Sequence, residues 1–184
     1  ALTPSASGTG VFTIASPATS TDRTLTLPDE AGTVLTSASP VVLPKGGPTF
    51  RAYRSGTNQT VSNGVYTKVQ YNGQSWDITD CYDNNSNYRF QPSVSGYYQI
   101  NANVSCAVSS SVTRTIVELY KNGTAHSVLF DTINYFIRGG GSDMVAMNGT
   151  TDYLEVYYYI TAASPSVCAG SAESFFSASL VGAS

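Results

Sequence analysis

The fold class of this chain follows from one stretch, Tyr98-Gln-Ile-Asn-Ala-Asn-Val-Ser-Cys-Ala-Val108. Its apolar residues recur at every second position, and the positions between them hold mainly amides and hydroxyls. Side chains two positions apart point to the same face of a β-strand. The stretch therefore predicts a long strand with one buried face.

Shorter stretches repeat this alternation along the chain, over residues 65–71, 115–120, 143–147, 153–160 and 176–180. Asn-Gly pairs suited to tight hairpin turns begin at Asn63, Asn72, Asn122 and Asn148. No window has the apolar spacing of a helix. Many short strands joined by turns predict an all-β antiparallel sandwich or barrel.

Composition excludes several classes of protein. With 41% hydrophobic and 11% aromatic residues, the 184-residue chain is too apolar for an intrinsically disordered protein. Its net charge of −3 and its nine scattered lysines and arginines offer no basic surface to nucleic acid. Its apolar runs, such as Val41-Val42-Leu43, fall far short of the ~20 residues that cross a membrane. We therefore expect a folded protein that binds no nucleic acid and inserts into no membrane.

The composition changes near residue 40. Residues 1–39 hold no Tyr or Trp, whereas all 13 tyrosines lie from Tyr53 onward. A Pro- and Gly-rich joint, residues 40–48, separates this first part from residues 49–184. The apolar faces in residues 1–39 are two or three residues long, too short to offset the entropy of ordering them alone. We expect them to form short strands only against other copies of the chain or against the larger part.

The three cysteines, Cys81, Cys106 and Cys168, have no zinc-ligand spacing. One interpretation is that they are buried thiols in a reducing compartment. The alternative is a single bridge between Cys106 and Cys168, which both lie in apolar, strand-like surroundings.

Residues 50–181 resemble the C1q/TNF-like jelly roll. The most specific part is Phe90-Gln91-Pro92, a short gap, and then Gly96-Tyr97-Tyr98-Gln99-Ile100. The chain departs from the family in lacking the collagen stalk of C1q members and in having Gly149-Thr150-Thr151-Asp152 where a Gly-Asp pair is usual. The resemblance implies an antiparallel jelly-roll sandwich that assembles as a homotrimer.

Residues 8–36 resemble the neck segment that precedes the head of tailed-phage fibre proteins. The recognisable part is Thr-Leu-Thr-Leu-Pro-Asp at positions 24–29, followed by Gly-Thr-Val at 32–34. Together the two resemblances imply a trimeric virion fibre protein, assembled in the host cytoplasm. Its neck would attach to other virion structural proteins, and its head would bind a host-surface glycan or protein. The alternatives are a secreted C1q-like recognition protein and a capsid-decorating structural fibre that binds no receptor.

No enzyme motif appears in the sequence. The single histidine, His126, has the position of a surface or interface residue on a strand. No Gly-x-Ser-x-Gly or P-loop occurs, and Gly139-Gly140-Gly141 lacks the Lys-Ser/Thr of a phosphate loop, so we expect a flexible loop there. We expect no catalytic residue, no cofactor and no metal site.

Residues 76–87 are the candidate binding loop. Aromatic rings can stack on sugars while Asn and Asp bind hydroxyls, and the candidate residues are Trp76, Asp80, Tyr82, Asn84 and Asn85. If a neck precedes the head, we expect this loop, together with residues 139–143 and 162–169, at the end of the head far from the neck. The loop contains three aspartates, Asp77, Asp80 and Asp83. The alternatives for them are Asx turns that hold the loop, a calcium site, or a pair of carboxylates that cleave glycosides.

Tyrosines also mark a candidate trimer interface. In residues 153–160, alternation places Tyr158 with the aliphatic residues on one face and Tyr153, Tyr157 and Tyr159 on the other. A row of exposed tyrosines calls for a partner, and interfaces are enriched in tyrosine. We expect these three tyrosines to contact another copy of the chain. The alternative is a platform for sugars.

Overall fold

A computed structural model describes residues 20, 47–108, 112–133 and 137–183. Except for Ser20, the predicted neck (residues 1–39) lies outside these residues, as does most of the joint (40–46). The strands and attachment role expected for the neck therefore stay predictions.

The described residues form thirteen strands, and all of the pairings between these strands are antiparallel. The strands are β1 (Thr49–Tyr53), β2 (Gln59–Thr60), β3 (Thr67–Lys68), β4 (Gly73–Ile78), β5 (Tyr82–Asp83), β6 (Arg89–Phe90), β7 (Gly96–Ala107), β8 (Arg114–Lys121), β9 (Thr124–Ile133), β10 (Arg138–Met147), β11 (Leu154–Thr161), β12 (Ser166–Val167) and β13 (Phe175–Ala183). Within the described ranges no helix is long and apolar enough to cross a membrane.

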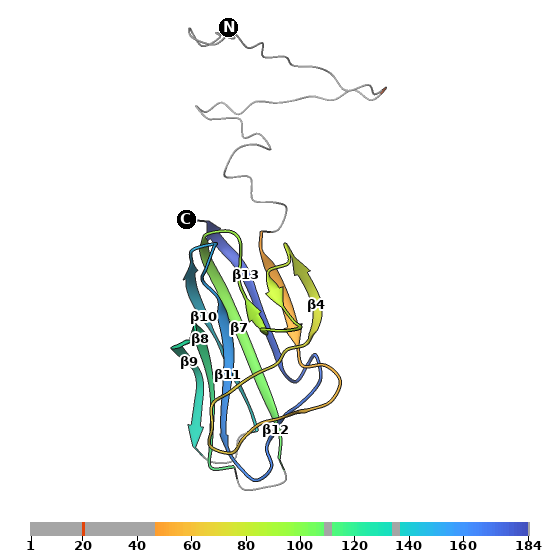
Figure 1. The fold of residues 1–184 in the computed structure, drawn as a ribbon, viewed down its shortest axis with the longest axis vertical. Coiled ribbons are helices and arrows are strands. Elements are labelled where there is room, and N and C mark those ends of the chain that lie inside the picture. Colours follow the sequence, from red (N-terminus) through yellow and green to blue (C-terminus); the bar gives the residue numbers. More distant parts are fainter. Residues whose placement is uncertain (1–19, 21–46, 109–111, 134–136, 184) are drawn as a thin grey trace. The chain divides into compact units, whose positions relative to one another are not determined.

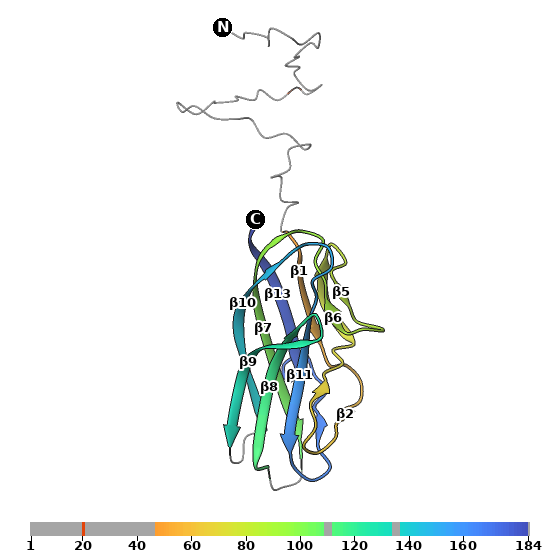
Figure 2. The ribbon, with the colours of Figure 1, turned by 60° about the vertical axis from the view of Figure 1, so that its left-hand side comes forward.

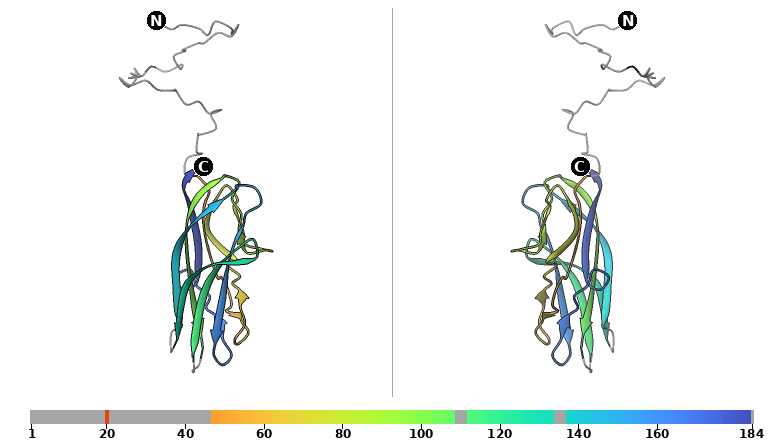
Figure 3. Two further views of the ribbon diagram at one scale, coloured as in Figure 1. Left: turned by 90° about the vertical axis from the view of Figure 1, so that its left-hand side faces the viewer. Right: turned by 90° about the vertical axis from the view of Figure 1, so that its right-hand side faces the viewer.

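The strands form two sheets that pack face to face (Figures 1, 2 and 3). The seven-stranded sheet has the order β2-β12-β7-β13-β1-β4, and β10 also pairs with β7. The six-stranded sheet has the order β5-β6-β11-β8-β9, and β3 also pairs with β11. β1 begins and β13 ends at one end of the sandwich, which we call the proximal end; the opposite end is distal.

Aromatic rings fill much of the core between the sheets. The ring of Phe50, on β1, stacks on Tyr82 with centroids 4.6 Å apart and lies 5.0 Å from both Phe90 and Phe176. Tyr98 is fully buried, and its hydroxyl donates to the carbonyl oxygen of Val94 at 2.7 Å. The cluster joins strands from both sheets, so it holds the sandwich together.

β7 and β11 confirm the patterns read from the sequence. On β7 the side chains of Tyr98, Ile100 and Val104 are buried, while Tyr97 and Asn101 are exposed. On β11 the apolar residues and Tyr158 face the core, and the odd-numbered tyrosines lie on the outer face. Both strands had enough alternating positions for the sequence to fix which face is buried.

The expected loop at Gly139–Gly141 is wrong, because these glycines lie within β10. They pair with Val104, Asn103 and Ala102 of β7. A Cβ atom on Gly139 would lie 2.5–2.6 Å from ring atoms of Phe130, and one on Gly141 would lie 2.5 Å from the carbonyl oxygen of Leu129. The glycines therefore allow β10 to lie close against β9, which belongs to the other sheet.

The strand predicted over residues 65–71 is shorter in the structure, where only β3 has strand geometry. Val69 and Tyr71 nevertheless point into the core, with no exposed surface. Beyond β3, the backbone N–H of Gln70 donates to the side-chain oxygen of Gln59 at 2.8 Å. The N–H of Val69 still donates to the Val156 carbonyl of β11 at 2.9 Å, so a side chain takes the place of a neighbouring strand only at Gln70.

All three cysteines are free thiols, so the Cys106–Cys168 bridge is not formed. Cys106 pairs with Val167 across β7 and β12, and both are buried. Cys168 directly follows β12 and is only partly buried. Cys81 is also buried, and burial raises the pKa of its thiol, as does its hydrogen bond to Asp77.

Candidate functional site

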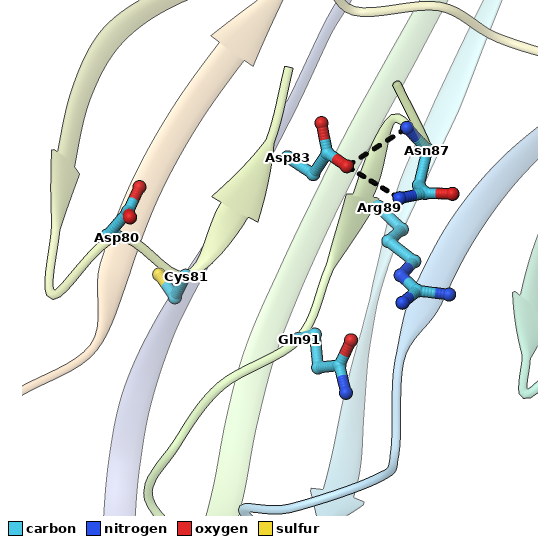
Figure 4. Close-up of a pocket in the computed structure, with 6 residues that line it drawn as sticks. All are labelled: Asp80, Cys81, Asp83, Asn87, Arg89 and Gln91. Carbon is cyan, nitrogen blue, oxygen red and sulfur yellow. Dashed lines mark hydrogen bonds between the residues drawn. The ribbon is translucent and has the colours of Figure 1, made fainter. Parts of the chain in front are cut away.

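A polar hollow of about 190 Å³ lies beside the β5–β6 hairpin (Figure 4). The residues that line it are Asp80, Cys81, Asp83, Asn87, Arg89 and Gln91. Figure 4 shows Asp80 at one side of this group and Arg89 at the other. The sequence pointed to Asp80 but missed Arg89 and Gln91, which lie on and just after β6.

The carboxylate of Asp83 holds the hairpin turn. Its oxygens accept the backbone N–H groups of Asn85, Ser86 and Asn87 at 2.9–3.0 Å, and the side-chain amide of Asn87 at 2.7 Å. These bonds, above all that from Ser86, lower the pKa of Asp83 to about 2. Asp83 is therefore a fixed anion that is already committed to four N–H donors.

Asp77 has a similar structural role. Its two oxygens accept the backbone N–H groups of Cys81 and Tyr82 at 2.9 and 3.0 Å. A carboxylate surrounded by N–H donors is poorly placed to bind a cation. Among the described residues no three acidic, histidine or cysteine side chains gather as a metal site would require. The geometry therefore favours the turn-holding alternative over calcium for Asp77 and Asp83.

Two charged side chains of the hollow lack an ionic partner within the described part of the chain. The guanidinium of Arg89 lies over the ring of Tyr153, 4.5 Å from its centroid, and makes no ion pair or hydrogen bond there. The carboxylate of Asp80 is exposed and likewise makes no hydrogen bond. The side-chain N–H of Gln91 donates to the carbonyl of Thr150 at 3.1 Å, which fixes the amide while its oxygen stays available.

The structure separates the residues that the sequence grouped as a ligand site. Tyr82 is removed from the candidates, because it is 3% exposed and stacks in the core. Trp76 is 47% exposed, but it lies on the outer face of the seven-stranded sheet, where its N–H reaches the Thr49 hydroxyl at 3.5 Å. Asn84 and Asn85 lie in the hairpin turn without lining the hollow. Of the five candidates only Asp80 lines it.

The prediction that residues 76–87 lie at the end of the head far from the neck is also wrong. Ile78, the last residue of β4, pairs with Thr49, the first residue of β1. The turn that follows β4 therefore lies at the proximal end. Residues 162–165 do lie at the distal end, beside β12 (Figure 1).

The row of Tyr153, Tyr157 and Tyr159 lies on the outer face of the six-stranded sheet and is half-buried. Each ring already has a partner within the chain. Tyr157 stacks on Tyr120 with centroids 4.0 Å apart, Tyr159 contacts Tyr66 at 5.1 Å, and Tyr153 lies under Arg89. These contacts within the chain reduce the need for contact with a second copy. The trimer interface at this row stays a prediction.

A second surface has a stronger need for a partner. Five large apolar side chains, 42–59% exposed, lie on the outer face of the seven-stranded sheet toward the proximal end, and we call them the apolar belt: Trp76, Ile78, Tyr97, Met144 and Val181. The registers place Ile78, Thr49, Ser179, Gln99 and Met144 in one row across five strands. The belt thus has apolar side chains at both ends of this row, with uncharged polar side chains between them, and large exposed apolar side chains gathered on one face of a folded domain point to an interaction site.

The geometry around His126 differs from that of a hydrolase triad. The Ser127 hydroxyl donates to Asp143 Oδ2 at 2.7 Å, and His126 Nε2 lies 3.8 Å from the same oxygen. A triad needs the histidine between the hydroxyl and the carboxylate, whereas here the carboxylate lies between the other two. The arrangement fits a surface pair between β9 and β10.

Asp83→Asn is expected to lower the free energy of unfolding by ~1–2 kcal/mol at pH 7, because the new amide N–H₂ would face N–H donors. Since the folded pKa of about 2 lies below the ordinary 3.8, the contribution of the charge is present above about pH 4 and is lost as the pH falls toward 2. Urea unfolding of both proteins at pH 7 and pH 2 would measure it. Asp80→Asn, which replaces an exposed carboxylate without such donors, is the control and should change the free energy of unfolding at pH 7 by less than about 0.5 kcal/mol; an equal effect of both variants at pH 7 would contradict the role of the turn.

Comparison with known proteins identifies the fold. No family model and no curated protein matches the chain. Among solved structures, murine APRIL is 12% identical, with a TM-score of 0.52 over 73% of this chain and 98% of that one. Eiger TNF from S. frugiperda is 9% identical, with a TM-score of 0.52 over 74% and 93% of the two chains. At these identities the likeness concerns architecture alone. The chain's head is a TNF-like jelly roll of two antiparallel sheets.

Proposed function

We propose that the protein is a trimeric fibre protein without enzymatic activity, whose head recognises a receptor on a host surface and whose residues 1–39 attach it to a virion. The observation that carries the proposal is the apolar belt, which would be exposed to water in a monomer. The resemblance of residues 8–36 to a fibre neck supports the attachment role. The TNF-like fold supports the trimer, because proteins of this fold are typically trimeric.

The belt suits contact with another copy of the chain. Homo-oligomers with closed symmetry are the usual assemblies of soluble proteins. Interface cores are enriched in aromatic residues and methionine, which the belt contains, and are depleted of charge. Within the row from Ile78 to Met144 the side chains between the apolar ends are Thr49, Ser179 and Gln99, which carry no charge.

Met144→Glu is expected to convert the trimer to monomers, because burying an unpaired carboxylate at each of three equivalent contacts is strongly unfavourable. Sedimentation equilibrium of the full chain at micromolar concentration should give three times the 19.4 kDa chain mass for the wild type and one chain mass for the variant. Val128→Glu is the matched control: Val128 is 56% exposed, against 53% for Met144, but lies on β9 away from the belt.

Three results would contradict this assembly. A monomeric wild type would remove the trimer, and a trimeric Met144→Glu would remove the belt as its interface. A monomeric Val128→Glu would place the contact at β9. The attachment role has its own test, since antibody-gold labelling in electron microscopy should find the head on virus particles, and deletion of residues 1–38 should leave a folded head that no longer joins them.

A further inference from the structure

We propose that the outer face of the six-stranded sheet binds an amino sugar of the receptor, with the charged amino group of the sugar at the carboxylate of Glu118. The inference rests on the recognition role proposed above and gives that role a place and a ligand chemistry. The place is the tyrosine face, which we define as Glu118 together with the four tyrosines around it: Tyr66, Tyr120, Tyr157 and Tyr159.

Glu118 points outward from the sheet. It lies between Val117 and Leu119 on β8, whose side chains belong to the core, and neighbouring residues of a strand point to opposite faces. Glu118 pairs with Tyr157 on β11 and with the exposed Val128 on β9. Neither neighbouring strand therefore places a charged residue directly opposite it.

Three more tyrosines complete the surroundings of Glu118. Tyr120 follows two positions later on the same face of β8, and its ring stacks on Tyr157 with centroids 4.0 Å apart. Tyr159 is a diagonal neighbour on β11, and its ring contacts that of Tyr66 at 5.1 Å. Burial and, after it, the negative charge of Glu118 raise the pKa of Tyr66 and of Tyr120, as expected for hydroxyls near a carboxylate.

The carboxylate of Glu118 has no cationic partner within the described part of the chain. Nearby cations are already paired. Lys68 binds Glu155 at 2.9 Å, and Arg114 binds Asp131 at the same distance. A half-buried charge among aromatic rings is less screened by water than an exposed one, and aromatic rings attract cations that lie over their faces. The tyrosine face therefore suits a positively charged ligand, and a uronic acid or sulfated sugar would be repelled.

The spread of the tyrosines favours a sugar as the carrier of this charge. The rings come from β8, from β11 and from the residue before β3, so they offer apolar contact beyond the ammonium group itself. A sugar with a free amino group can donate N–H bonds to Glu118 while its ring contacts the tyrosines. The apolar belt lies on the other sheet, on the opposite side of the sandwich. A trimer held through the belt does not need to cover the tyrosine face, and three copies of the site would strengthen weak binding.

An array probed with the labelled full-length protein tests the inference. It carries oligomers of glucosamine and of galactosamine with free amino groups, the same oligomers with acetylated amino groups, and a lysine-containing peptide. At mildly acidic pH, where the free amines are charged, we expect binding to at least one kind of free-amine oligomer. Its acetylated form should bind at least ~10-fold more weakly, because acetylation removes the charge, and the peptide should also bind more weakly.

Variants locate the site. Glu118→Gln should weaken binding to the free-amine oligomer at least ~10-fold, as expected for a lost hydrogen bond between charged groups. Tyr66→Leu, which keeps apolar bulk without the ring, should weaken it about 2- to 5-fold. Asp80→Asn is the matched control, since it also removes one negative charge without an ionic partner, but in the turn between β4 and β5. It should leave binding unchanged, which separates the site from general attraction between an anionic protein and a cationic glycan.

Four results would each overturn the inference: equal binding to free and acetylated oligomers, no binding to any free-amine oligomer, stronger binding to the lysine peptide, or binding by folded Glu118→Gln that equals that of Asp80→Asn. Urea unfolding and sedimentation show whether each variant keeps its fold and assembly. Should Glu118→Gln fail to fold, the two forms of the oligomer still decide the matter on the wild-type protein. The fibre proposal would survive any of these results, because trimer mass and particle labelling are measured independently.

Discussion

Gly140→Ala is expected to lower the free energy of unfolding of the head by about 3 kcal/mol, the upper part of the range for overpacked sites. The new Cβ would overlap the carbonyl oxygen of Ala102 and lie 2.8 Å from the Cα of Asn103. Both atoms belong to the backbone of β7, which pairs with β10 on one side and β13 on the other. The clash can be relieved only by moving a central strand.

Gly182→Ala provides the control for this prediction. Gly182 also lies in a strand, on β13, but a Cβ there would meet no atom within 4 Å. Urea unfolding at one fixed protein concentration should show a change within about 0.5 kcal/mol for Gly182→Ala, as for other unconstrained surface positions. Similar effects of the two variants would mean that β10 does not lie against β7 as described here.

The loop predicted at the three adjacent glycines is a strand in the structure. Three glycines in a row are typical of a flexible loop, because glycine is disfavoured in the interior of a strand. Here Gly139 faces Phe130 and Gly141 faces the Leu129 carbonyl, both on β9. Only the tertiary structure places β9 against β10, since the two strands belong to different sheets. Local propensity therefore could not identify the contact that makes glycine necessary.

The candidate site was predictable only in part for a related reason. Alternation correctly divided the side chains of β7 and β11, which are long enough to fix a register. Between residues 76 and 91 the strands β5 and β6 have two residues each, separated by turns. No period can be read from so few positions, so Tyr82 could equally have pointed outward. Arg89 gave no signal, because its role depends on Tyr153, which is 64 positions away in the sequence.

Phe50→Ala is expected to lower the free energy of unfolding by about 4 kcal/mol, within the range for removing a buried phenylalanine. The Phe50 side chain is fully buried, and its ring contacts Tyr82 and Phe90 of the six-stranded sheet and Phe176 of its own sheet. Deleting the ring removes these contacts and leaves a cavity in the middle of the sandwich. The rings around it are held by two sheets, so they can close only part of the space.

Phe175→Ala is the matched control, because Phe175 lies next to Phe176 on β13 but points to the outer face. Its ring is half-buried and lies under the Arg51 guanidinium, 4.8 Å from the ring centroid. Losing that contact at a partly exposed site should cost about 1 kcal/mol. Urea unfolding of both variants at one protein concentration measures the two losses of stability. For each variant the dependence of the free energy of unfolding on urea concentration should be compared with that of the wild type. If Phe175→Ala were as costly as Phe50→Ala, the aromatic cluster would not be the main link between the two sheets. The outer face of β13 around Phe175, at the other end of this strand from Val181 of the apolar belt, would then carry much of the stability.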